Sequence, residues 1–153
     1  MRSVRSIAKF IAVATLSAFA LAACARSSRL LETEFYPSPR PGAPFAQGVR
    51  VGDILFLSGE IGTDSSGRLV PGGLQAEARQ ALNNIRATTE RLGSSMDRVV
   101  KCTVFLADIK DWADFNEIYI SYFRARKPAR SAMAASGLAL GARVEIDCIA
   151  VMS

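Results

Sequence analysis

Apolar and charged residues alternate along the C-terminal part of the chain. In 142–152, ARVEIDCIAVM, one face would carry Val144, Ile146, Cys148 and Ala150, and the other Arg143, Glu145 and Asp147. Because successive side chains of a strand point to opposite faces, this segment is predicted to be a half-buried strand. The segment 98–108, RVVKCTVFLAD, is rich in β-branched residues and predicts a second strand, whose buried face consists of Val100, Cys102, Val104 and Leu106.

Apolar residues at helical spacing occur in two segments. Residues 74–92 predict an amphipathic helix that stops at Gly93. Its stripe consists of Leu74, Ala78, Ala81, Leu82, Ile85, Thr89 and Leu92. Residues 111–123, DWADFNEIYISYF, predict a second helix that is capped near Asp111, with a stripe formed by Trp112, Phe115, Ile118, Tyr119 and Tyr122.

The remaining segments are shorter. Residues 47–60, QGVRVGDILFLSGE, predict a hairpin that turns at Gly52 and Asp53, and 129–135, ARSAMAA, predicts a short strand. The proline-rich stretch before the hairpin predicts irregular chain. The order β-β-α-β-α-β-β predicts an α+β sandwich with both helices on one face of the sheet. The other face has no helix to cover it, so it must contact either solvent or another copy of the chain.

The N-terminus has the pattern of an export signal. Arg2, Arg5 and Lys9 precede an apolar run at 10–20, which is shorter than the about 20 residues that a spanning helix needs. The run ends in LAAC, which matches the lipobox of bacterial lipoproteins, so Cys24 is the predicted lipidation site. We therefore expect a signal peptide at 1–23, a lipid-anchored tether at 24–32 and one domain at 33–153. An ordinary signal peptide is the alternative; Ala25 after the cysteine favours the periplasmic side of the outer membrane.

Removal of residues 1–23 changes the charge balance. The whole chain has 19 basic and 14 acidic residues, and three of the basic ones lie in the signal, which leaves 16 − 14 = +2. A charge this small argues against nucleic-acid binding through a generally basic surface. Cys102 and Cys148 lie in apolar runs and are expected to be buried thiols, with a disulfide as the alternative in an oxidising periplasm. Without histidine, no zinc site is expected.

The absence of histidine also limits the candidate chemistry. It excludes a Ser–His nucleophile pair and leaves carboxylate, Lys, Tyr or Cys as general acid or base. Two charged residues stand out in apolar strands, Arg130 and Glu145. Each could be a solvated edge residue, or the two could form a structural salt bridge. As a functional pair, the guanidinium would bind a carboxylate through two hydrogen bonds and the glutamate would transfer a proton.

Four blocks of the sequence occur in a characteristic order: GAPFAQGVRVGDILFLSGEIG, VVKCTVFLADIKDWADFNEIYISYF, KPARS and VEIDCIAV. Together they cover about 32–152, and they resemble the RidA/YjgF family of reactive-intermediate deaminases. The resemblance implies a chorismate-mutase-like α+β fold with a mixed sheet, and a homotrimer with its clefts between subunits. It also implies hydrolysis of short 2-imino acids, tautomers of enamines, to 2-oxo acids and ammonia without a cofactor.

The resemblance also implies roles for individual residues. Arg130 matches the arginine that binds the substrate carboxylate, and Glu145 matches the glutamate that positions or activates water. Other matched cleft positions are Ser58, Gly59, Asn116 and Phe45. Three positions depart from the common pattern: Phe45 replaces a tyrosine, Glu60 replaces a glutamine, and Ala132 replaces a cysteine or threonine.

Two other functions remain as alternatives. The same cleft could bind small carboxylates without turning them over, as a trimeric periplasmic module. Some relatives carry an endoribonuclease label, but the small charge of the mature chain and the lack of histidine argue against a nuclease.

Overall fold

The computed structural model describes residues 31–153. The predicted signal peptide, Cys24 and all but the end of the tether lie outside these residues. The described strands are β1 (Thr33–Pro37), β2 (Ala46–Val51), β3 (Ile54–Leu57), β4 (Glu60–Ile61), β5 (Val99–Leu106), β6 (Ala129–Ala134) and β7 (Val144–Val151). The α-helices are α2 (Gly73–Arg91) and α3 (Trp112–Tyr122), and short 3₁₀ turns are η2 (Met96–Arg98), η3 (Ile109–Asp111) and η4 (Ala139–Gly141).

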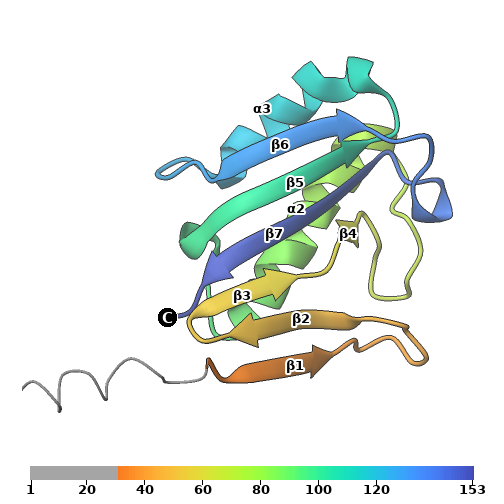
Figure 1. Cartoon of the computed structure of the whole chain (residues 1–153). Helices are drawn as coiled ribbons and strands as arrows, with labels where there is room; N and C mark the ends of the chain where they lie inside the picture. The colour runs from red at the N-terminus through yellow and green to blue at the C-terminus, as the bar shows by residue number, and fades with distance from the viewer. Residues whose placement is uncertain (1–30) are drawn as a thin grey trace, which may run out of the picture. The chain divides into compact units, whose positions relative to one another are not determined.

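The strands form one mixed sheet. Their order is β1-β2-β3-β7-β5-β6, and β4 also pairs with β7. The β5–β6 pair is parallel and the others are antiparallel. Both helices lie on the same face of this sheet (Figure 1). The predicted α+β class, with a mixed sheet and two helices on one face, is confirmed.

The core lies between the helices and the central strands. The predicted alternation of β7 is confirmed, since Val144, Ile146 and Ala150 have no exposed surface. The α2 stripe meets them with residues that are also fully buried, Ala78, Ala81, Leu82, Ile85 and Thr89. Burying one large aliphatic side chain contributes about 1.5–3 kcal/mol, so this layer holds the helices on the sheet. Within 31–153, neither helix has the length and apolarity needed to cross a bilayer.

Four details differ from the sequence predictions. The segment before the hairpin includes β1, and the sheet is interrupted between β3 and β4 at Ser58 and Gly59. In β5, the pairing with β7 shifts between Val99 and Lys101, so Val99 is buried while Val100 is 46% exposed. Such a bulge inserts an extra residue and reverses which side chains face the core. Trp112, predicted to lie in the buried stripe of α3, is 45% exposed.

The face opposite the helices is uncovered in this chain, as expected from the pattern. Strand register places four apolar side chains in one row across it: Phe35, Val49, Phe56 and Ile149. Phe35 is 68% exposed and Phe56 42% exposed. We call this row the open-face apolar row. Its members are neighbours across three strand pairs, so they form one contiguous patch, as interaction surfaces do, and are not isolated exposed residues.

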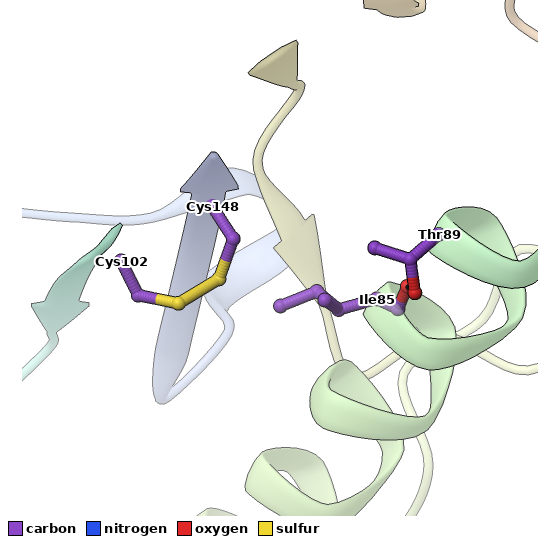
Figure 2. The surroundings of a disulfide bond; sticks show 4 residues. All are labelled: Ile85, Thr89, Cys102 and Cys148. Carbon is purple, nitrogen blue, oxygen red and sulfur yellow. Dashed lines mark hydrogen bonds between the residues drawn. A yellow bond between two sulfur atoms is a disulfide. The ribbon is translucent and has the colours of Figure 1, made fainter. Parts of the chain in front are cut away.

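Cys102 and Cys148 are joined by a disulfide (Figure 2). They are register partners on β5 and β7, and both are buried on the helix side of the sheet, where Ile85 and Thr89 of α2 face them. Burial was predicted and is confirmed; the favoured interpretation as two free thiols is wrong. Direct opposition on antiparallel strands brings the two side chains within bonding range, which the sequence alone could not establish.

The disulfide is expected to stabilise the domain substantially. It closes a separation of 46 residues, and a cross-link of this kind restricts the unfolded chain, with a typical effect of about 2–4 kcal/mol. Dithiothreitol should therefore lower the denaturation midpoint of a chain that lacks residues 1–24. The control is the double variant Cys102→Ala/Cys148→Ala, whose midpoint should not respond to dithiothreitol. Two reactive thiols in the unreduced, denatured protein would contradict the bond.

Candidate active site

The interruption between β3 and β4 opens a cleft of about 960 Å³. Five residues singled out in the sequence line it: Phe45, Ser58, Gly59, Glu60 and Glu145. The other walls are mostly polar residues, chiefly from α2 and from the loops before β2 and after β4. The cleft therefore brings together the predicted glutamate and the residues expected to surround it. We call it the glutamate cleft.

Glu145 occupies its position because residue 59 is a glycine. A Cβ atom at Gly59 would lie 2.2 Å from Glu145 Oε1 and 3.0 Å from its carboxyl carbon. Real side chains do not approach this closely, so any larger residue at this position would displace the carboxylate. The glycine is needed for this close approach, and its backbone φ is not in the left-handed region.

Ser58 and Phe45, which also line the glutamate cleft, have different surroundings. Ser58 Oγ donates a 2.6 Å hydrogen bond to the carbonyl of Ala46, and its backbone N–H donates to the carbonyl of Gln47. These bonds fix the end of β3 to β2 at the mouth of the cleft. Phe45 is 48% exposed and presents a ring, without a hydroxyl, to the same space.

Glu60 points toward α2 and takes part in a polar network. Its carboxylate accepts a hydrogen bond from Thr88 Oγ1 at 3.3 Å; that hydroxyl also accepts one from Gln47 Nε2 at 2.9 Å. Arg91 in turn donates to Gln47. Burial raises the pKa of Glu60, while its bonds with Gln47 and Thr88 and the charges of Arg40 and Arg91 lower the pKa in part. The negative charge that Glu60 adds, compared with the more common glutamine, is thus partly compensated by Arg40 and Arg91.

Arg130 lies on the helix side of edge strand β6. Its Nη2 donates a 2.7 Å hydrogen bond to Asn116 Oδ1, which joins the two predicted residues. The guanidinium carbon lies 4.6 Å from the ring centre of Tyr119 and 5.8 Å from those of Trp112 and Phe115. Cation–π contacts contribute about 0.5–2 kcal/mol each, depending on exposure. We call these five residues the arginine cluster.

The arginine cluster holds a positive charge that forms no ion pair with a carboxylate of the described residues. Ion pairs within 31–153 are Arg68–Asp64 and Arg143–Asp111, and Arg130 belongs to neither. Burial raises the pKa of Tyr119 to about 12, although the charge of Arg130 acts in the opposite direction. The phenol therefore stays neutral at physiological pH and cannot act as a counter-ion. A half-buried, oriented guanidinium of this kind suits an anionic ligand.

The structure does not bring Arg130 and Glu145 together within one chain. Arg130 is in register with Cys102, whose side chain is buried on the helix side. Glu145 lies between the fully buried Val144 and Ile146, so its side chain leaves the opposite face of the sheet. The structural salt bridge considered as an alternative is therefore absent from the described chain.

Comparison with known proteins gives consistent results. The family model described as Endoribonuclease L-PSP matches residues 36–152. The mouse protein named 2-iminobutanoate/2-iminopropanoate deaminase is 45% identical over 115 residues, which cover 74% of this chain and 85% of that protein. The human protein of the same name is 42% identical over 127 residues, covering 81% of this chain and 93% of its own. The chain belongs to the RidA/YjgF family.

Solved structures confirm the RidA/YjgF fold. RidA from an Antarctic Psychrobacter superposes with a TM-score of 0.70 at 32% identity, covering 82% of this chain and 100% of that one. TdcF from E. coli, solved with bound serine, gives a TM-score of 0.69 at 34% identity, again covering 82% of this chain and all of the other. Whole relatives thus correspond to the part of this RidA/YjgF chain that follows its N-terminal segment.

Sequence reasoning missed part of the RidA/YjgF site. It assigned Trp112, Phe115 and Tyr119 to the buried stripe of α3 and did not predict that their rings surround Arg130. Their spacing of three and four residues was the available signal, since it places them on one helix face with Asn116.

Ala132 lies two residues after Arg130 on the same side of β6 and packs against the core. Within 31–153, no three His, Cys, Asp or Glu side chains are grouped to hold a metal.

The raised pKa of Glu60 predicts a pH-dependent stability difference. Above this raised pKa, Glu60 is ionised in the folded state, and the burial of its charge lowers the free energy of unfolding. This destabilisation decreases as the pH falls through the raised pKa and is absent below the ordinary value of 4.5. Glu60→Gln should therefore raise the free energy of unfolding at pH 7–8, with the gain disappearing toward pH 4. The measurement is urea denaturation across this range, with exposed Glu90→Gln as the control; a gain that is independent of pH would contradict the assignment.

Proposed function

We propose that the protein hydrolyses short 2-imino acids to 2-oxo acids and ammonia. The observation that carries this proposal is Arg130, a half-buried cation that is held by Asn116 and three aromatic rings and has no carboxylate partner in 31–153. The names of the mouse and human relatives support the same reaction.

Arg130 would bind the substrate carboxylate. One of its five N–H donors is used by Asn116, which leaves an edge of the guanidinium for two parallel bonds to a carboxylate. A hydrogen bond to a charged group contributes about 1.5–3 kcal/mol. The aromatic rings limit the orientations of the guanidinium, so little further ordering is needed when the ligand binds.

Glu145 would act on water. Its carboxylate accepts a proton from a water molecule as the water oxygen forms a bond to C2 of the imine. The same proton then passes to the nitrogen, which has taken the electron pair of the C2=N π bond, and a carbinolamine results. Glu145 next accepts the hydroxyl proton as the C2=O bond forms and the C2–N bond breaks, and it transfers this proton to the departing nitrogen, which leaves as ammonia. This sequence needs one proton carrier and no cofactor, and general acid–base catalysis contributes about 10²–10⁴-fold.

We further propose that each site is completed by a second copy of the chain, in a homotrimer. The side chains of Arg130 and Glu145 leave opposite faces of the sheet, so one chain cannot present both to the same small substrate. The open-face apolar row provides a surface that association would bury. Light scattering of the chain without residues 1–24 should give three times the mass of one chain.

The proposed location follows from the N-terminus. We propose that residues 1–23 are removed and that Cys24 is lipidated, anchoring the domain to a bacterial membrane, with the periplasmic side of the outer membrane as the expected site. The Cys102–Cys148 disulfide supports an oxidising compartment. Mass spectrometry of the mature chain tests the lipid directly, because an unmodified Cys24, or a chain still carrying residues 1–23, would refute it.

The reaction can be tested with imines generated by an amino-acid oxidase and trapped with semicarbazide. Wild type should reduce the amount of trapped imine. Arg130→Ala should lower kcat/KM by about 10- to 150-fold, the equivalent of the bond energy above. Glu145→Gln should lower kcat by about 10²–10⁴-fold. Gly59→Ala should also lower kcat, because the added methyl group displaces the flexible end of Glu145.

Matched controls separate catalysis from folding. Arg126→Ala removes an exposed arginine from the loop before β6 and should leave the rate unchanged. Circular dichroism should show the same fold for each variant. An Arg130→Ala protein with wild-type activity would refute the proposal. Binding of 2-oxo acids that depends on Arg130, without any imine hydrolysis, would instead favour the non-catalytic carboxylate-binding module.

A further inference from the structure

The described chain begins at an edge of the sheet where several strands start or end. This edge crosses the strands and is distinct from the edge strands β1 and β6. Strand register connects the start of β1 to the β2–β3 turn, to the end of β7 and to the starts of β5 and β6. In Figure 1 these points lie together on the left side of the sheet. Strand β1 therefore begins at this edge of the sheet.

The β5–β6 corner of this edge is basic. Four exposed cations lie in η2 and in the loop between α3 and β6: Arg98, Arg124, Arg126 and Lys127. Arg98, Arg126 and Lys127 line one shallow groove of about 850 Å³, in which Asp97 is the acidic residue. Neither ion pair within 31–153 involves any of the four. We call these four residues the basic corner.

The distribution of charge along the edge is uneven. Glu32 lies at the β1 corner, whereas Asp53 is nearer the groove, because its carbonyl accepts a hydrogen bond from Met152, the neighbour of the groove residue Val151. Four cations thus lie near two carboxylates, those of Asp97 and Asp53, and this local excess of positive charge is compatible with the small net charge of the mature chain. Within a few ångströms, local charge matters more than net charge, because salt screens interactions beyond about 8 Å.

Two exposed apolar side chains accompany the cations. Val100 is 46% exposed because the bulge in β5 turns it away from the core, and Val151 is 36% exposed at the end of β7. Both line the groove with the basic residues. Basic residues beside apolar ones are typical of surfaces that lie at the headgroup boundary of a bilayer.

The length of the tether is compatible with contact. Residues 24–32 are nine residues, and a fully extended chain spans about 3.3–3.6 Å per residue, or about 30 Å in total. If Cys24 is lipidated, the edge at which β1 begins stays within this distance of the bilayer.

We propose that the basic corner binds the anionic phospholipid surface of the membrane to which the chain is anchored. The orientation rests on the proposed lipidation of Cys24, but the affinity of the domain for anionic lipid does not. The arginine cluster and the glutamate cleft contribute no residue to the basic corner. The binding surface and the proposed catalytic residues can therefore be altered independently.

The test uses residues 25–153, which contain the whole described core and correspond to complete chains of solved relatives. Flotation is measured with phosphatidylcholine vesicles and with vesicles that contain 30 mol% phosphatidylglycerol, at about 25 mM and 500 mM salt. The domain should float only with the anionic vesicles and only at low salt. Absence of flotation with anionic vesicles at low salt would overturn the proposal.

A charge-matched pair of variants locates the surface. Arg98→Gln/Arg126→Gln/Lys127→Gln should reduce the vesicle partition coefficient by about 100-fold, since each Lys or Arg near an anionic surface contributes about 1 kcal/mol, or about five-fold. Arg68→Gln/Arg79→Gln/Lys110→Gln removes three exposed charges elsewhere and should change it little. Equal losses in the two variants would overturn the proposal, as would binding of the basic corner to free inorganic phosphate or RNA in preference to vesicles.

Other readouts keep the separate proposals apart. Retained imine hydrolysis shows that the basic-corner variant is folded, and unchanged melting temperature shows the same if the deaminase proposal itself fails. An unmodified Cys24 would remove the anchor without affecting flotation of residues 25–153. If residues 25–153 fail to float while Cys24 of the full chain is acylated, only the lipid-surface proposal is refuted.

Discussion

The antiparallel pairing of β5 with β7 is the interaction on which the other features depend. It places Cys102 opposite Cys148, and its alternation directs one set of side chains to the helices and the other to the open face. A slip of one residue would exchange the two sets, which would place Glu145 in the core and expose Val144. The disulfide prevents this slip covalently, while burial against α2 opposes it through the loss of apolar contacts. The same register determines from which face each candidate catalytic group leaves the sheet.

This geometry divides the chemistry into two half-sites. The arginine cluster is built between an edge strand and α3, where aromatic rings and Asn116 orient a charge without neutralising it. The glutamate cleft is built where the sheet is interrupted, and Gly59 leaves room for Glu145. Each half-site is ordered within its own chain, so association of chains would assemble a site from parts that are already in place. The proposed association would also account for an uncovered, partly apolar sheet face in a chain that otherwise has a complete core.

Much of the fold followed from periodicity in the sequence. Both helices and the strands of the central sheet were predictable because a long buried stripe or face leaves a regular pattern in residues 74–92 and 142–152. The β5 bulge and the exposure of Val100 were not predictable, since they depend on pairing with β7. The disulfide was left open for the same reason, because the opposition of Cys102 and Cys148 is a property of register. Arg130 and Glu145 were candidates because they are charged positions in apolar strands, and the family resemblance added Asn116. Neither pattern nor resemblance predicted the aromatic surroundings of Arg130, which arise from packing α3 on β6.

The central claim, that Arg130 and Glu145 act on one substrate from different chains, can be tested by complementation. Arg130→Ala and Glu145→Ala chains with different affinity tags would be co-expressed, and oligomers containing both would be isolated by sequential purification. If each interface joins the arginine of one chain to the glutamate of the next, every trimer that contains both variants has about one intact interface in three. Imine hydrolysis at about a third of the wild-type rate, well above the rate of either variant alone, is the predicted result. Mixed oligomers with no more activity than the separate variants would contradict the shared site.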